Sequence, residues 1–295
     1  PRIEFDSYED FYENFRIEVP ENFNFAYDVV DEWARVEPEK KALVWINDAG
    51  EERTFTFTDI SRLSNRAANA FWQLGIRKGD VVMMMLRRRW EYWVCAVALA
   101  KIGASIIPAT IQLTSKDIAY RANSADVKMV ICVDDDYVVE QVEGALPNAA
   151  SIKDKVLVAG THEGWLSFDE LIEGASDEWE RPTGDAATSI DDIMLIYFTS
   201  GTTGNAKAVE HSFKHPLGHI LTAKYWQQVR ENHLHMSVTD SGWAKFGWGK
   251  IYGQWIAGAT IFCYDMDKFI PAKLLQVMQD YDLATFCAPP TMYRF

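Results

Sequence analysis

The stretch that decides the fold joins an apolar run, IMLIYF at residues 193–198, to a polar run, TSGTTGNAK at residues 199–207. The apolar run is rich in residues that favour β-structure, which predicts a buried strand. The polar run contains two glycines, and backbone N–H groups in such a turn can surround an anion. Its hydroxyls add further donors, and the lysine that ends it supplies a positive charge suited to phosphate. The stretch therefore predicts a strand that leads into a polyphosphate-binding loop.

The loop is distinct from a Walker loop, in which Lys directly follows the second Gly and precedes Ser or Thr. Here Lys207 comes three residues after Gly204, and Ala208 follows it. An ordinary solvated turn is the alternative, and the density of hydroxyls beside two glycines and a lysine disfavours it. The candidate phosphate-binding residues are Thr199, Ser200, Gly201, Thr202, Thr203, Gly204, Asn205, Ala206 and Lys207.

Composition excludes several classes of protein. The 295 residues are 48% apolar and 13% aromatic, which is enough for a sizeable core and argues against disorder. The net charge of −14 disfavours nucleic acid as a main partner, because nothing general offsets phosphate repulsion. No apolar run approaches the length of a membrane span.

Four cysteines lie far apart, at Cys95, Cys132, Cys263 and Cys287, without the spacing of a metal site or a disulfide framework. We therefore expect a reducing compartment and a cytoplasmic location. The N-terminal residues are acidic and aromatic, without a signal or transit pattern.

Strand and helix patterns alternate along the chain, which predicts an α/β fold with mostly parallel sheets flanked by helices. We expect one subdomain over residues 1–185, including an N-terminal arm, and a second over 186–295 that begins with the phosphate loop. The acidic segment 174–189 is the candidate linker. Among the expected helices are those at 25–36, 212–230 and 248–257, and Thr58 is the expected cap of a helix that ends before Gly75.

The polar loop resembles the phosphate loop of adenylate-forming enzymes, whose pattern is Thr-Ser-Gly-Ser/Thr-Thr/Ser-Gly-x-Pro-Lys. This family includes acyl-CoA synthetases, aryl-CoA ligases, luciferases and peptide-synthetase adenylation domains. Ala206 stands where the pattern has proline, which loosens the backbone before Lys207 and removes no ligand group. Segments 24–29, 110–121, 240–243 and 288–294 look like the medium-chain acyl-CoA synthetase branch.

The resemblance implies the large N-terminal domain of such an enzyme, with ATP, Mg²⁺ and CoA as cofactors and a carboxylic acid as substrate. It places the β- and γ-phosphates of ATP on Thr199 to Lys207, with Lys207 stabilising phosphate charge during catalysis. It places CoA near Gln112, for which a surface amide is the alternative. It places Gly242, Trp243 and Phe246 at the acyl pocket, where a core tryptophan is the alternative for Trp243.

Two further groups invite a functional interpretation. The run Arg87-Arg88-Arg89 could attract a CoA phosphate, but a charge run is usually a solvated turn, and we prefer that interpretation. The histidines do not match a closed metal site, so we predict no metal ligand in this chain. They are His211, His215, His219, His233 and His235.

The family's later motifs, which support magnesium, adenine and ribose, are absent from residues 1–295. We therefore expect a fragment that lacks the C-terminal domain and is inactive alone, with the Mg²⁺ ligands outside it. A non-catalytic nucleotide-binding module and a ligase for aryl or other acids are the alternatives.

Overall fold

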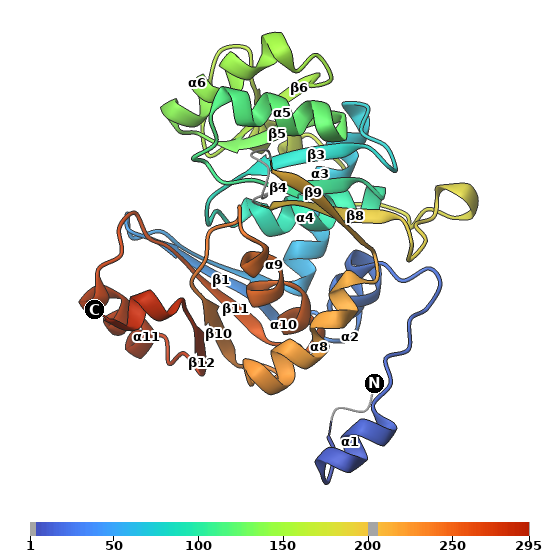
Figure 1. The fold of residues 1–295 in the computed structure, drawn as a ribbon, viewed down its shortest axis with the longest axis vertical. Helices are drawn as coiled ribbons and strands as arrows, with labels where there is room; N and C mark the ends of the chain where they lie inside the picture. Colours follow the sequence, from blue (N-terminus) through green and yellow to red (C-terminus); the bar gives the residue numbers. More distant parts are fainter. Residues whose placement is uncertain (1–3, 200–205, 295) are drawn as a thin grey trace.

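The computed structural model describes residues 4–199 and 206–294 (Figure 1). Two sheets form its frame, one with the strand order β7-β6-β5-β3-β4-β8-β9 and one with the order β12-β10-β11-β1-β2. Pairing is parallel throughout except between β1 and β2 and between β8 and β9. The predicted α/β fold with mostly parallel sheets is confirmed.

Strand β8 matches the apolar run expected to form a buried strand. The seven-stranded sheet contains β3 (Val81–Met85), β4 (Ser105–Pro108), β5 (Val127–Val133), β6 (Asp154–Val158), β7 (Leu166–Ser167), β8 (Ile193–Thr199) and β9 (Lys207–Ser212). The five-stranded sheet contains β1 (Lys41–Asn47), β2 (Glu52–Thr56), β10 (Leu234–Ser237), β11 (Thr260–Asp265) and β12 (Thr285–Cys287).

The two sheets do not follow the expected division at residues 185/186. Strand β1, from the start of the chain, pairs with β2 on one side and with β11, from near the end of the chain, on the other. Strand β8 instead joins the earlier sheet beside β4. Strand pairing is decided by long-range packing, which a linker-like composition at 174–189 does not report.

The α-helices surround these sheets (Figure 1). They are α1 (Tyr8–Asn14), α2 (Glu32–Val36), α3 (Phe57–Gln73), α4 (Glu91–Ile102), α5 (Ser115–Ala125), α6 (Asp136–Ala145), α7 (Phe168–Glu173), α8 (His219–Leu221), α9 (Ala244–Lys250), α10 (Tyr252–Ile256) and α11 (Pro271–Asp280). Helix α3 is capped by Thr56, two residues before the expected cap Thr58, because Thr56 and Asp59 bond reciprocally to each other's backbone N–H groups.

Three expected helices are broken in the structure. The segment 25–36 divides into a π-helical turn (Ala26–Asp31) and α2. The segment 212–230 begins with Ser212, the last residue of β9. It continues as three short helical turns (His215–Gly218, His219–Leu221 and Thr222–Trp226), and Pro216 lies in the first of them. The segment 248–257 is interrupted at Ile251, where φ is −140° and ψ is −74°. Side-chain packing decides these breaks, since apolar periodicity alone cannot distinguish one long helix from several short ones.

One core spans both sheets, and α3 and α4 pack together within it. Trp93 on α4 is fully buried, and its Nε1 donates to the carbonyl oxygen of Lys250 on α9 at 3.0 Å. Trp255 on α10 donates from Nε1 to the carbonyl oxygen of Ala42 on β1 at 2.9 Å. Large indole rings therefore join α4 to α9 and α10 to β1 through packing and through satisfied N–H groups.

Candidate active site

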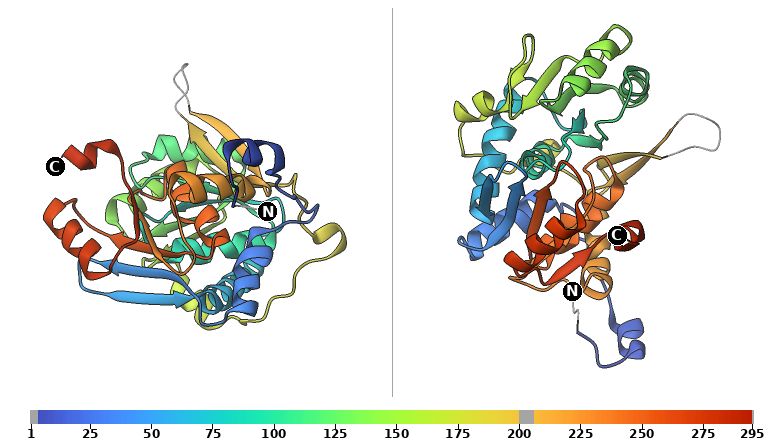
Figure 2. Two further views of the ribbon diagram at one scale, coloured as in Figure 1. Left: turned by 90° about the horizontal axis from the view of Figure 1, so that it is seen from below. Right: turned by 90° about the vertical axis from the view of Figure 1, so that its left-hand side faces the viewer.

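The predicted phosphate loop connects two antiparallel strands at the edge of the larger sheet. Thr199 ends β8 and pairs with Lys207, which begins β9. Both residues are exposed, and Figure 2 shows the β8–β9 hairpin projecting from the body of the molecule. Residues Ser200, Gly201, Thr202, Thr203, Gly204 and Asn205 lie outside the described residues. The structure therefore positions the two ends of the predicted cradle.

Helix α5 anchors the second end of this loop. The hydroxyl of Tyr120 donates to the carbonyl oxygen of Ala206 at 2.9 Å. The Tyr120 ring meets the Phe198 ring of β8 edge-on, with centroids 6.3 Å apart. The Arg121 guanidinium lies over the same Phe198 ring, 5.2 Å from its centroid. Nothing in the loop pattern indicated Tyr120 as a support, because the contact spans 86 residues of sequence.

A second predicted site segment lies against the loop that precedes α5. Gly242 is so close to the chain after β4 that an added Cβ would lie 2.3 Å from the backbone nitrogen of Thr110. Gln112 is exposed two residues further on, and its N–H donates to the Thr110 hydroxyl at 3.3 Å. The predicted CoA and acyl segments therefore adjoin each other, and only a glycine permits this contact.

Trp243 and Phe246 occupy different environments. Trp243 precedes α9 with its side chain 63% exposed. Phe246, one turn later, is fully buried between Tyr92 and Trp93, with ring centroids 4.5 and 4.9 Å away. Of these two predicted pocket residues, Trp243 has an exposed aromatic surface, and Phe246 supports α9 from the core.

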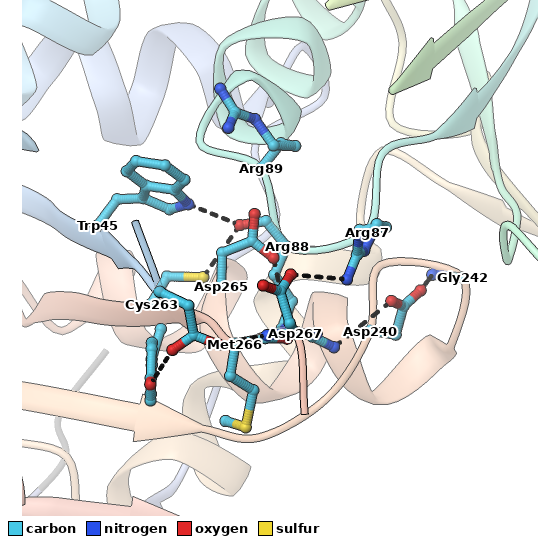
Figure 3. Close-up of polar contacts among 12 residues, drawn as sticks. Trp45, Arg87, Arg88, Arg89, Asp240, Gly242, Cys263, Asp265, Met266 and Asp267 are labelled. Carbon is cyan, nitrogen blue, oxygen red and sulfur yellow. Dashed lines mark hydrogen bonds and ion pairs between the residues drawn. The ribbon is translucent and has the colours of Figure 1, made fainter. Parts of the chain in front are cut away.

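The arginine run is a partly buried junction between the sheets, so our interpretation of a solvated turn was wrong. The Arg88 side chain is only 17% exposed and lies within ion-pair distance of Asp240 and Asp265, at 3.7 and 3.8 Å (Figure 3). Arg89 binds Glu91 through two hydrogen bonds of 3.0 and 2.7 Å. Sequence offered no sign that Arg88 is buried, because its partner carboxylates, Asp240 and Asp265, lie more than 150 residues away.

Strand ends from both sheets meet at this junction. The loop after β3 contains Arg87, whose carbonyl oxygen accepts the Ser241 N–H at 3.1 Å. Ser241 belongs to the loop after β10, and Asp265 ends β11. Ligands of open α/β sheets bind outside the carboxyl ends of the strands, so this edge is the expected position for a substrate.

Three histidine rings lie in a row between β9 and α10, each tilted or edge-on to the next. Ring centroids are 4.4 Å apart for His211 and His215 and 4.6 Å apart for His215 and His219, whose Nε2 atoms are 3.1 Å from each other. Burial and the neighbouring rings lower the pKa of His215 to about 3 and that of His219 to about 4. Burial also lowers the pKa of His211. Both rings of the close pair are therefore neutral near pH 7, and one donates to the other.

The described residues contain no group of three or more His, Cys, Asp or Glu side chains placed to hold a metal ion. Within the same part of the chain, no helix is both long and apolar enough to span a membrane. All four cysteines are buried free thiols.

A Gly/Ser/Thr-rich segment that follows a parallel strand of an α/β fold is typical of nucleotide-binding proteins. The family model described as AMP-binding enzyme matches residues 30–295, so the chain belongs to that family. The resemblance to adenylate-forming enzymes is thereby confirmed.

Among curated relatives, the chain is 36% identical to mitochondrial acyl-coenzyme A synthetase ACSM4 of Mus musculus, over 94% of this chain and 48% of the relative. It is 34% identical to mitochondrial acyl-coenzyme A synthetase ACSM3 of Homo sapiens, over 98% of this chain and 50% of the relative. The chain thus spans about half the length of the curated relatives it matches.

Solved structures share the fold. A Brucella canis acyl-CoA synthetase superposes with a TM-score of 0.85 at 20% identity, over 98% of this chain and 53% of that one. The anthranilate CoA ligase AuaEII, in complex with anthranoyl-AMP, superposes with a TM-score of 0.79 at 21% identity, over 91% of this chain and 50% of that one.

Proposed function

We propose that this chain is the N-terminal portion of an ATP-dependent acid–CoA ligase, with a medium-chain fatty acid as substrate. The proposal is supported by the match to the AMP-binding family, by the contact of Gly242 with Thr110 beside Gln112, and by the hydrogen bond from Tyr120 to Ala206. The identity to medium-chain-type acyl-coenzyme A synthetases supports the choice of acid. A cytoplasmic location remains a prediction.

The proposed reaction has two displacements. A carboxylate oxygen of the acid attacks the α-phosphorus of ATP, and pyrophosphate leaves with the electrons of the broken P–O bond. The CoA sulfur then attacks the acyl carbonyl carbon, and AMP leaves. Each step needs reactants held in line and stabilisation of phosphate charge, rather than a protein nucleophile.

Lys207 and the Thr199 hydroxyl are donors at the two ends of the loop, and both are exposed to a ligand. In the proposal they hold the β- and γ-phosphates, with Ser200 to Asn205 completing the set. Bound Mg²⁺ would neutralise phosphate charge, and its ligands are expected outside this chain. Gln112 is proposed to contact CoA.

The proposed acyl wall consists of Gly242 and Trp243, with Phe246 behind them in the core. Gly242 lets the turn lie directly on Thr110, and Trp243 offers an exposed aromatic surface to an apolar chain. An aryl acid would fit the same kind of surface, so a ligase for aryl acids is the second candidate.

Acid-dependent exchange of pyrophosphate into ATP tests the proposal. The full-length protein is assayed with short-, medium- and long-chain fatty acids and with benzoate, and we expect the highest exchange with medium-chain acids. Residues 1–295 alone are expected to show none. ATP binding without exchange for any acid would favour the non-catalytic nucleotide-binding module, and a preference for benzoate would favour the aryl-acid ligase.

A further inference from the structure

We propose that Arg88 is a positioning residue for acid recognition, because it holds the turn at 240–242 that presents Trp243. This inference rests on the proposed function. Arg88 touches none of the predicted ligand positions itself, and it acts through Asp240.

The contacts of Arg88 fix the residue at both ends (Figure 3). Its guanidinium donates to the carbonyl oxygen of Met266 at 2.5 Å, just beyond β11. Its own carbonyl oxygen accepts hydrogen bonds from Trp45 Nε1 at 2.9 Å and from the Cys263 thiol at 3.3 Å. The side chain therefore projects from a rigid attachment on the five-stranded sheet toward the turn.

A short chain of contacts leads from Arg88 to the turn. The guanidinium lies 3.7 Å from the Asp240 carboxylate, and the other oxygen of that carboxylate accepts the Gly242 N–H at 3.2 Å. The carboxylate thus holds the backbone from which Trp243 extends, and Arg88 holds the carboxylate. Both side chains are mostly shielded from water, with Arg88 17% and Asp240 21% exposed. Solvent screens such a pair less than an exposed one.

Backbone hydrogen bonds also restrain the turn, and one of them joins the Trp243 N–H to the Asp240 carbonyl oxygen at 3.2 Å. The Ser241 N–H donates to Arg87, but the buried Ser241 hydroxyl has no hydrogen-bond partner among the described residues. Gly242 rests on Thr110 through van der Waals contact. Removing the Arg88 guanidinium would leave Asp240 partly buried beside fewer positive charges, and the turn would gain freedom.

The phosphate loop is anchored elsewhere, through Tyr120 and Ala206. A change at Arg88 should therefore affect recognition of the acid and spare recognition of ATP. Losing a partly buried ion-pair contact of this kind corresponds to about tenfold in a binding constant.

The test compares Arg88→Met with Arg87→Met in the full-length protein. Methionine keeps an apolar stem in both, and the Arg87 guanidinium lies within ion-pair distance of the exposed Asp267, at 3.8 Å. We expect Arg88→Met to raise KM for the acid about tenfold, with KM for ATP changed less than about twofold. Arg87→Met should leave both values unchanged.

Hydrogen exchange provides a readout that does not depend on activity. In Arg88→Met, the amides of Ser241 and Gly242 should exchange at least about tenfold faster, with no change in Arg87→Met. If Arg88→Met does not fold, Asp240→Asn weakens the same contact from its other partner and should give the same exchange pattern. Unchanged exchange, or equal increases in KM for acid and ATP, would overturn the proposal. If the Ser241 and Gly242 amides exchange faster in Arg88→Met but the wild type has no acid-dependent activity, only the proposed function is refuted.

Discussion

At the scale of the residue, Gly242 illustrates a requirement that comes from close packing rather than from backbone conformation. Its φ lies outside the left-handed region, so another residue could adopt its backbone angles. The contact with Thr110 leaves no room for a Cβ atom. Sequence indicated this glycine through its resemblance to a family segment, and the reason for it became apparent only when two loops 130 residues apart were found in contact.

We predict that Gly242→Ala lowers the free energy of unfolding by about 1–3 kcal/mol, since a methyl group must displace backbone atoms. The same change should lower acid-dependent exchange at least about tenfold, because the turn that carries Trp243 moves. Gly174→Ala is the control, since nothing lies within 4 Å of its added Cβ. Denaturant unfolding and the exchange assay measure both effects, and equal behaviour of the two variants would contradict the packing argument.

Lys207 is the other prediction at this scale. Lys207→Met should lower kcat for adenylate formation by about 100-fold, because the variant loses a positive charge that faces the phosphates in the transition state. Lys214→Met removes a lysine that pairs with Asp191 on the surface, and it should leave kcat unchanged. A Lys207→Met variant with wild-type kcat in a pyrophosphate-release assay would exclude this role.

At the scale of the element, strand β8 was predicted correctly from its apolar run. That run is local information, and the polar residues that follow it are visible in the sequence. The helices after it were not predictable in the same way. The row of rings from His211 to His219 packs against Tyr252, and that contact accompanies short turns where periodicity suggested one helix.

This histidine row predicts a pH dependence of stability. The unfolded chain protonates histidine near pH 6.5, whereas the folded pKa values of His215 and His219 are about 3 and about 4. Between these limits the unfolded state binds more protons, so stability is full above pH 6.5 and falls as pH decreases toward 4.

His219→Gln should therefore weaken that fall by about 1–2 kcal/mol between pH 7 and pH 4.5, because one titrating group is removed. His162→Gln, at an exposed position, should leave the pH dependence as in wild type. Denaturant unfolding at several pH values measures the slope. If His219→Gln shows the same fall in stability with pH as the wild type, the His215–His219 pair does not govern that fall.

At the scale of the whole molecule, the two sheets share one hydrophobic core, and buried tryptophans are part of it. We predict that Trp93→Phe lowers the free energy of unfolding by about 2–4 kcal/mol, through a cavity and the lost hydrogen bond to Lys250. Unfolding should remain a single transition, because residues of both sheets share the core.

Trp226→Phe is the matched control, since its side chain is 60% exposed and its loss should cost less than about 1 kcal/mol. Thermal and denaturant unfolding, followed by far-UV circular dichroism, compare the two variants. Two separated transitions in Trp93→Phe would mean that the sheets fold independently.

The amino-acid sequence alone was sufficient for the alternation of strands and helices and for the strand that leads to Thr199. Each of these depends on neighbours within a few positions, where side-chain periodicity and turn chemistry act directly. The pairing of β1 with β11, the burial of Arg88 and the contact of Gly242 with Thr110 depend instead on residues more than 100 positions apart. Such contacts form only when the hydrophobic core brings distant segments together, so they became known from the tertiary structure.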